Sequence, residues 1–221
     1  MPKMVAFGDS ITYGQCLPDC TIDKIYYGPN YSKFAWPTLV ANKLGMKYTN
    51  ISVPGASNDL ILHNIINFEG LEKDDHVIIL WTFIHRADIF ENNGNRISIS
   101  PNKISESKAT GSVEWESFYK VHGDYDLFVR TVENIHHAMC HLNLKGVTVS
   151  NFSIDISHLL WKNKHTANTT SMSVDVRQID LPTVMIDKAS DDWHPGIESQ
   201  ARIADIIYNV HCTTHNLKGK L

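Results

Sequence analysis

No stretch of the sequence is apolar over the roughly 18 residues that a membrane-spanning helix needs. The apolar run before Asp9 is also too short for the hydrophobic core of a secretory signal peptide. The sequence also has no cluster of basic residues. Its 20 Lys and Arg residues are outnumbered by 24 Asp and Glu residues, which gives a formal net charge of −4. This balance argues against nucleic acid or an anionic membrane as the main partner. We therefore expect a cytoplasmic protein with no membrane span and no nucleic-acid partner.

Cysteine is scarce, and its spacing fits no zinc motif. The four cysteines, which an intracellular setting would keep as thiols, are Cys16, Cys20, Cys140 and Cys212. One metal-like pattern remains, His136-His137-x-x-Cys140-His141, whose i, i+4 pairs could share a helical face. The apolar residues of the same segment mark a buried face from which His137 and His141 point largely away. We expect no metal and no organic cofactor.

The Gly-x-Ser-x-Gly pentapeptide of the α/β-hydrolases is absent as well. A serine nevertheless occurs near the N-terminus, where the apolar run 3–7 predicts a strand and the following Gly-Asp-Ser breaks it and can cap a helix. Ser10 is therefore expected at a strand-to-helix turn. In open α/β sheets ligands bind at this edge, where a helix start also offers free N–H groups. Ser10 is a candidate nucleophile, and the alternative is that it only caps the helix.

Residues 190–196 supply the partners that such a serine needs, because Asp191 and His194 stand three positions apart. A serine hydroxyl needs a base to take its proton, and the base needs a third group that fixes its tautomer and stabilises its cation. Pro195 biases His194 away from helical backbone, so we expect the imidazole on a loop just before the last helix. The alternative is a capping aspartate and a surface histidine.

Together, the Gly-Asp-Ser that ends at Ser10 and the Asp-x-x-His of Asp191 and His194 resemble the SGNH, or GDSL, hydrolase family. In that family the nucleophile lies in an N-terminal Gly-Asp-Ser block and the Asp-x-x-His pair lies near the C-terminus. Residues 53–58 are similar to the family's glycine block. The resemblance implies a serine esterase in which Ser10 is the nucleophile, His194 the base and Asp191 the residue that orients the base.

Gly55 follows the second predicted strand, 47–52, in the same kind of turn that Ser10 occupies after the first strand. Backbone N–H groups from two adjacent strand ends could converge on one oxygen, and a glycine permits close approach of a substrate. We therefore expect the N–H groups of Ser10 and Gly55 to form an oxyanion hole. The alternative is an ordinary turn glycine.

The sequence departs from the family after its third predicted strand, 76–83, which should lie mid-sheet because it is almost continuously apolar. The family usually has Gly-x-Asn-Asp there, with the asparagine as third oxyanion donor. Here we take Thr82 as the candidate donor, and His85 and Arg86 as candidate substrate-binding residues, since a guanidinium suits a carboxylate or phosphate. A Trp-Thr followed by Arg is similar to virus-encoded members. It hints at a phage-like protein of the host cytoplasm or the virion.

The alternation of strands and helices predicts one domain over residues 1–221, with an insertion around 87–123. We expect a three-layer α/β/α sandwich with a mainly parallel sheet of about five strands, similar to SGNH hydrolases and flavodoxin-like proteins. Residues 181–186, with Pro182 near the start, are expected as the fifth strand, and 197–210 as the last helix. The insertion leaves from the third strand, so it should form a lid or pocket wall. Decoration unrelated to the site is the alternative.

The function expected from these residues is hydrolysis of acyl esters, acetyl esters included, of a small-molecule, carbohydrate or lipid substrate. The competing expectation is a binding or virion-associated module that keeps the fold but has weakened catalysis, since the family's asparagine is missing. Only the first requires an activated serine, so labelling by a fluorophosphonate separates the two.

Overall fold

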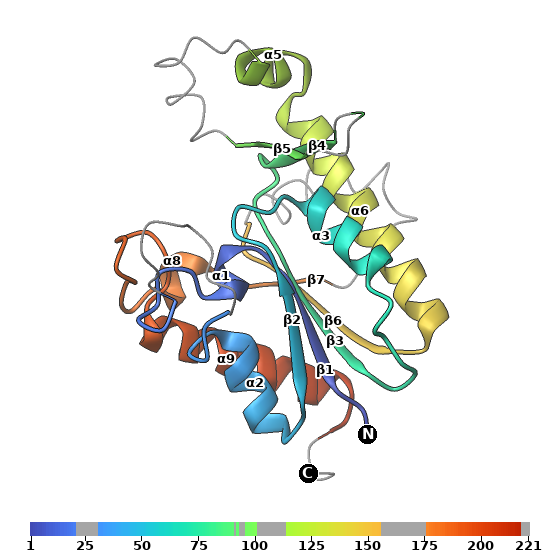
Figure 1. Ribbon diagram of the computed structural model, residues 1–221, viewed down its shortest axis with the longest axis vertical. Helices are drawn as coiled ribbons and strands as arrows, with labels where there is room; N and C mark the ends of the chain where they lie inside the picture. Colours follow the sequence, from blue (N-terminus) through green and yellow to red (C-terminus); the bar gives the residue numbers. More distant parts are fainter. Residues whose placement is uncertain (21–30, 91, 93–95, 101–113, 156–175, 218–221) are drawn as a thin grey trace.

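The structure, a computed structural model, describes residues 1–20, 31–90, 92, 96–100, 114–155 and 176–217. In chain order its elements are β1 (Met4–Gly8), α1 (Ser10–Tyr13), α2 (Trp36–Leu44), β2 (Tyr48–Ser52), α3 (Asn58–Asn67), β3 (His76–Trp81), β4 (Ala87–Phe90), β5 (Arg96–Ile99), α5 (Glu114–Val121), α6 (Asp124–Lys145), β6 (Thr148–Ser153), β7 (Val176–Gln178), α8 (Leu181–Val184) and α9 (Ile197–Thr214). Figure 1 shows a central sheet with α2 and α9 on one face and α3 and α6 on the other. The predicted α/β/α sandwich is confirmed.

The main sheet of the described residues has five strands in the order β2-β1-β3-β6-β7, all paired in parallel. β3 is the central strand, as predicted, and it is buried from Val77 to Trp81 because helices cover both faces of the sheet. Parallel pairing places the carboxyl ends of all five strands at one edge. Figure 1 shows α1 at this edge, directly after β1.

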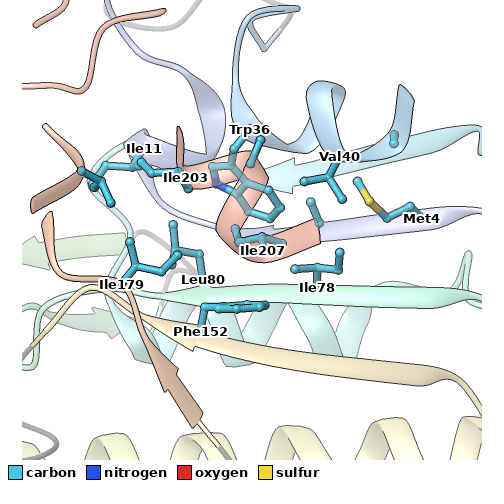
Figure 2. Packing of buried hydrophobic residues seen from close by; sticks show 14 of the residues in the cluster. Met4, Ile11, Trp36, Val40, Ile78, Leu80, Phe152, Ile179, Ile203 and Ile207 are labelled. Carbon is cyan, nitrogen blue, oxygen red and sulfur yellow. The ribbon is translucent and has the colours of Figure 1, made fainter. Parts of the chain in front are cut away.

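Alternate residues of each strand contribute to two separate cores, as the two-residue period of a strand requires. On one face, Met4, Ile78 and Phe152 pack with buried residues of α2 and α9 (Figure 2). On the other face, Phe7 and Trp81 pack with buried residues of α3 and α6. Each such side chain contributes roughly 1.5 to 3 kcal/mol when fully buried. The two cores therefore fix the sheet whose carboxyl edge carries the predicted site.

The prediction of a fifth strand at 181–186 is wrong. Leu181–Val184 forms the short helix α8, and the fifth strand is β7, which pairs with β6. Pro182 lies in the first turn of α8, where a missing N–H breaks no intrahelical hydrogen bond. The proline therefore suits a helix start as well as a strand edge, and in the helix Val184 is buried in the core.

The predicted insertion around 87–123 contains the antiparallel β4–β5 hairpin and α5; its residues 91, 93–95 and 101–113 lie outside the described ones. Asp88 of β4 attaches the hairpin to α3, because its Oδ2 accepts hydrogen bonds from the N–H (3.0 Å) and hydroxyl (2.5 Å) of Ser57. Its Oδ1 lies 2.7 Å from Nε of Arg96, so the buried carboxylate is paired. Figure 1 shows the hairpin beyond the carboxyl edge of the sheet.

α6 is the longest helix described, and it buries one apolar stripe that includes Leu127, Ile135 and Leu142. His137 and Cys140 of the metal-like pattern lie exposed on it. Within the described segments, no helix has both the length and the apolar character needed to cross a membrane.

A chain of hydrogen-bonded histidines lies near the amino ends of β3 and β6, away from the carboxyl edge. His211 Nε2 lies 2.8 Å from His76 Nδ1, and His211 Nδ1 lies 2.8 Å from Ser150 Oγ. His215 Nε2 contacts both Val149 O (3.0 Å) and Ser150 Oγ (3.1 Å). A carbonyl only accepts, so His215 Nε2 carries a proton and donates it to Val149 O.

The buried histidines should make stability depend on pH. Burial lowers the pKa of His211 to about 3, and the neighbouring His76 and His215 lower it further. Burial and His215 also lower the pKa of His76. A histidine in the unfolded chain takes up a proton near pH 6.5. The unfolded state therefore binds more protons below about pH 6.5, and the free energy of unfolding falls as the pH drops below that value.

Replacing His211 should flatten this dependence. His211→Gln should be less stable than wild type at neutral pH, because Ser150 and His76 lose a partner. Below about pH 6.5 its free energy of unfolding should nevertheless fall less steeply than that of wild type. The two slopes should differ by up to about 1.4 kcal/mol per pH unit, which is the contribution of one proton. Urea unfolding at several pH values measures both effects, with His137→Gln on the exposed face of α6 as control. Identical pH dependence in wild type and His211→Gln would contradict a lowered pKa of His211 in the folded protein.

Candidate active site

Ser10 lies at the β1-to-α1 turn that the sequence predicts. A Cβ on Gly8 would stand 2.1 Å from Thr12 Oγ1, so only glycine allows α1 to approach the end of β1 this closely. Asp9 is the N-cap of α1, since its Oδ1 accepts a hydrogen bond from Ile11 N at 3.0 Å. The capping role therefore belongs to Asp9, and Ser10 is the first helical residue. This finding excludes the alternative in which Ser10 only caps the helix.

The carboxylate of Asp9 is buried beside Ser10, and residues that follow β3 neutralise it. Its Oδ2 accepts hydrogen bonds from Thr82 Oγ1 (2.7 Å) and from Arg86 NH1 (2.8 Å). The same guanidinium nitrogen lies 3.1 Å from Thr82 Oγ1 and 3.5 Å from the carbonyl oxygen of Ala56. Arg86 thus connects the Ser10 turn, the segment after β3 and the turn after β2. A buried carboxylate needs such partners, because burying an unpaired charge is costly.

These contacts bear on the three candidates after β3. A threonine hydroxyl has one proton, and Thr82 donates it to Asp9, so the hypothesis of Thr82 as third oxyanion donor gains no support from the geometry. One end of the Arg86 guanidinium likewise donates to Asp9. Its Cζ atom lies 5.3 Å from the ring centroid of Phe83. His85 points toward the start of α6, with Nε2 3.2 Å from Asp124 Oδ1.

Gly55 occupies the turn after β2, beside the Ser10 turn. The two turns are joined by a hydrogen bond from Val53 N to Gly8 O at 3.2 Å. Gly55 has φ +72°, a left-handed conformation that favours glycine, and no described atom lies within 4 Å of where its Cβ would be. Ser98 of β5 donates a hydrogen bond to the Gly55 carbonyl at 3.3 Å. The inserted hairpin therefore contacts this turn, as a pocket wall would.

Asp191 and His194 lie on a loop of residues 188–195, which we term the Asp–His loop. Its two ends pair in antiparallel fashion, with Ala189 N donating to His194 O at 2.9 Å. His194 Nδ1 lies 2.5 Å from Asp191 Oδ2, while Asp191 Oδ1 accepts the backbone N–H groups of Trp193 and His194, each at 3.1 Å. The imidazole is oriented by the carboxylate. The side chain of His194 is partly buried, with 21% of its surface exposed.

The carboxylate of Asp191 is held ionised. Burial acts to raise the pKa of Asp191, but hydrogen bonds from the His194 ring and from the backbone N–H groups of His194 and Trp193 outweigh burial and lower it to about 2. The ionised carboxylate accepts the Nδ1–H of His194. In that tautomer Nε2 has no proton, so it can accept one from a hydroxyl.

The Asp–His loop is anchored next to the segment that carries Ser10. Ser190 donates two hydrogen bonds to the carbonyl of Cys16, from its N–H (3.3 Å) and its hydroxyl (3.0 Å). Buried Gln200 of α9 donates to Ile11 O of α1 at 3.0 Å and accepts from Trp36 N of α2 at 2.9 Å. The structure thereby brings residues 10–17 and residues 188–200 together at the carboxyl edge.

The start of α9 is capped from outside the helix. The carboxylate of Asp187 accepts the N–H groups of Glu198 (3.1 Å) and Ser199 (2.8 Å). A Cβ on Gly196 would stand 2.3 Å from this carboxylate, so the cap depends on that glycine. Sequence reasoning missed Asp187, Gln200 and Cys16. Of these three, Gln200 alone left a signal in the sequence, because it is a polar residue within the apolar helical pattern of residues 197–210.

One group of described residues could in principle hold a metal ion, because side-chain atoms of Cys16, Asp191 and His194 all lie within 4.8 Å of one another. The contact of 2.5 Å between Asp191 Oδ2 and His194 Nδ1 is too short for two ligands of one tetrahedral zinc ion, which stand about 3.3 Å apart at ordinary bond lengths. Asp191 and His194 therefore form a hydrogen-bonded pair beside Cys16.

Similarity to solved structures now adds to this geometry. No protein-family model and no curated protein matches the chain. A Desulfitobacterium hafniense protein named for the G-D-S-L lipolytic family has a TM-score of 0.52 at 14% identity, over 95% of this chain and 99% of its own. The chain has the SGNH hydrolase fold.

Two esterases share this SGNH hydrolase fold with the chain. The family 2 carbohydrate esterase of Corynascus thermopiles (Myceliophthora fergusii), which also carries a carbohydrate-binding domain, has a TM-score of 0.60 at 14% identity, over 97% of this chain and 67% of its own. The psychrotrophic esterase EstA of Pseudoalteromonas sp. has a TM-score of 0.54 at 10% identity, and the match covers 98% of this chain and 100% of EstA.

Removal of the Arg86 guanidinium should destabilise the protein strongly. Arg86→Ala leaves the buried Asp9 carboxylate without its counter-charge, so the free energy of unfolding should fall by about 3 kcal/mol. The control Lys43→Ala breaks an exposed ion pair with Asp205 (2.8 Å) and should cost less than about 1 kcal/mol. Urea unfolding measures both variants. Similar small losses in the two would contradict a structural role for the Arg86–Asp9 pair.

Proposed function

We propose that the protein is a serine hydrolase of acyl esters in which Ser10 is the nucleophile, His194 the base and Asp191 the residue that orients the base. The observation that carries the proposal is the hydrogen bond of 2.5 Å between His194 Nδ1 and Asp191 Oδ2. It sits on a loop that is bonded to the segment after α1, and Ser10 itself is left free of the capping role. An imidazole oriented by a carboxylate is the partner that a serine hydroxyl needs for activation, which supports the proposal.

In the proposed reaction, Ser10 Oγ attacks the ester carbonyl carbon while His194 Nε2 takes the hydroxyl proton. The developing oxyanion accepts hydrogen bonds from the N–H groups of Ser10 and Gly55. His194 then gives its proton to the departing alcohol, and an acyl group remains on Ser10. Water attacks this acyl-enzyme with His194 again as base, which releases the acid and restores the serine. The steps require no cofactor.

The substrate class proposed is an acyl ester, acetyl esters included, of a small molecule, a carbohydrate or a lipid. Esterases of the same fold, one of them a carbohydrate esterase, support ester cleavage as the chemistry. The inserted hairpin supports a shaped pocket, since Ser98 contacts the Gly55 carbonyl. The substrate alcohol should therefore meet this hairpin.

The second candidate is a binding module, virion-associated in one form, whose catalysis is weakened. One observation favours it: the proton of the Thr82 hydroxyl is used by Asp9 at the position where the family supplies a third oxyanion donor. A hole with two backbone donors would stabilise the transition state less, since one donor is worth about 3 kcal/mol elsewhere. The rate on an activated ester separates the two candidates.

Ser10→Ala should abolish covalent labelling by a fluorophosphonate and lower kcat on p-nitrophenyl acetate by roughly four or more orders of magnitude, because triad members act as a unit. Mass spectrometry of the labelled wild type should place the adduct on Ser10. The control Ser117→Ala changes an exposed serine of α5 and should label and turn over like wild type. Labelling and turnover that persist in Ser10→Ala would contradict the mechanism. Absence of both labelling and turnover in the wild type would favour the binding module.

A further inference from the structure

Cys16 lies where the segment after α1 meets the Asp–His loop. Its carbonyl oxygen accepts both hydrogen bonds of Ser190, so the backbone of Cys16 already holds the loop. Leu17, which follows Cys16, and Ala189, which precedes Ser190, are buried in one small apolar cluster, and Cys16 packs against this cluster. This junction joins the two parts of the proposed active site.

The thiol of Cys16 contacts the carboxylate of Asp191. Its Sγ lies within 4.8 Å of a carboxylate oxygen of Asp191 and of a ring nitrogen of His194. Burial raises the pKa of the Cys16 thiol to about 11, and the hydrogen bond to Asp191 and its negative charge add to this rise. A thiol with that pKa keeps its proton at neutral pH, whereas Asp191, with a pKa of about 2, is ionised. The thiol therefore donates and the carboxylate accepts.

The backbone at Cys16 is strained. Its φ of +64° is left-handed, a conformation that costs a residue with a Cβ roughly 1 kcal/mol or more and a glycine almost nothing. The chain nevertheless carries a side chain here. Such strain persists where the surroundings over-determine the conformation, and here the contacts to Ser190 and Asp191 do so.

We propose that Cys16 is a positioning residue whose thiol fixes the Asp191–His194 pair relative to the Ser10 segment. Asp191 receives three hydrogen bonds from Trp193 and His194, all within its own loop. Among the described residues, the Cys16 thiol is a group from another segment of the chain that lies beside Asp191, where the carboxylate can accept its proton. The inference rests on the proposed function, because the pair must meet Ser10 for catalysis.

The test compares Cys16→Ala with Cys16→Ser. Both variants keep a Cβ at the strained φ and the carbonyl that binds Ser190, so they differ in the donor alone. Cys16→Ala should lower kcat on p-nitrophenyl acetate on the order of tenfold, with KM nearly unchanged, because a hydrogen bond to a charged group is lost. Cys16→Ser should stay within about twofold of wild type, as should the control Cys20→Ala, which removes a thiol of the same segment.

A second readout does not depend on catalysis. The proton shared by His194 Nδ1 and Asp191 Oδ2 should give a low-field proton NMR resonance, because the contact is short. Without the thiol, Asp191 carries more negative charge toward the imidazole. The resonance should therefore move in Cys16→Ala but stay in place in Cys16→Ser, and the acid limb of the activity profile should move to higher pH in Cys16→Ala only.

Two results would overturn the proposal. One is a Cys16→Ala variant that matches wild type in kcat and in the NMR resonance. The other is an equal loss in Cys16→Ala and Cys16→Ser with unchanged thermal midpoints, which would make the thiol's shape the requirement and not its hydrogen bond. Failure of the proposed function gives a different pattern: turnover of wild type would be absent or independent of Ser10, while the NMR comparison still decides the role of Cys16.

Discussion

A buried negative charge holds the Ser10 turn in place. The carboxylate of Asp9 caps α1 with one oxygen and accepts from Thr82 and Arg86 with the other. Because Thr82 and Arg86 follow β3, these bonds form only when β1 and β3 pair side by side, as the parallel register requires. The turn that presents Ser10 therefore depends on the sheet as a whole and on one ion pair at its edge.

The second half of the site is built on a different principle. Within the part of the chain that the structure describes, no ion pair joins the Asp–His loop to the sheet. It is held by hydrogen bonds at its base, by the Asp187 carboxylate at the start of α9, and by the contacts of Ser190 and Gln200 to the N-terminal segments. α9 itself docks on α2 through the core that Figure 2 shows. Residues nearly two hundred positions apart thus meet because two helices on one face of the sheet pack together.

Local chemistry explains which features the sequence could predict. The Gly-Asp-Ser break after an apolar run predicts the Ser10 turn, because strand end, cap and glycine all lie within a few residues. The spacing of Asp191 and His194 likewise places both groups on one loop. The prediction of a strand at 181–186 was wrong because an apolar run of four to six residues fits a strand and a buried helix equally well, and Pro182 also suits a helix start.

Partners across the sheet could not be predicted in the same way. Thr82 and Arg86 were recognised as polar groups at the right strand end, but the sequence does not say which polar groups pair. The structure assigns the Thr82 proton and one end of the Arg86 guanidinium to Asp9, about 70 residues earlier in the chain. Asp187 and Cys16 were missed for the same reason. Their roles arise from segments that meet only in the folded chain.

The most direct measurement is a crystal structure of the wild-type protein after reaction with a fluorophosphonate. We expect phosphorus bonded to Ser10 Oγ, with the phosphoryl oxygen within about 3 Å of the N atoms of Ser10 and Gly55 and His194 Nε2 within about 3 Å of Ser10 Oγ. An adduct on another residue would contradict this expectation. So would an adduct on Ser10 whose phosphoryl oxygen points away from Gly55, or from which His194 Nε2 is turned away.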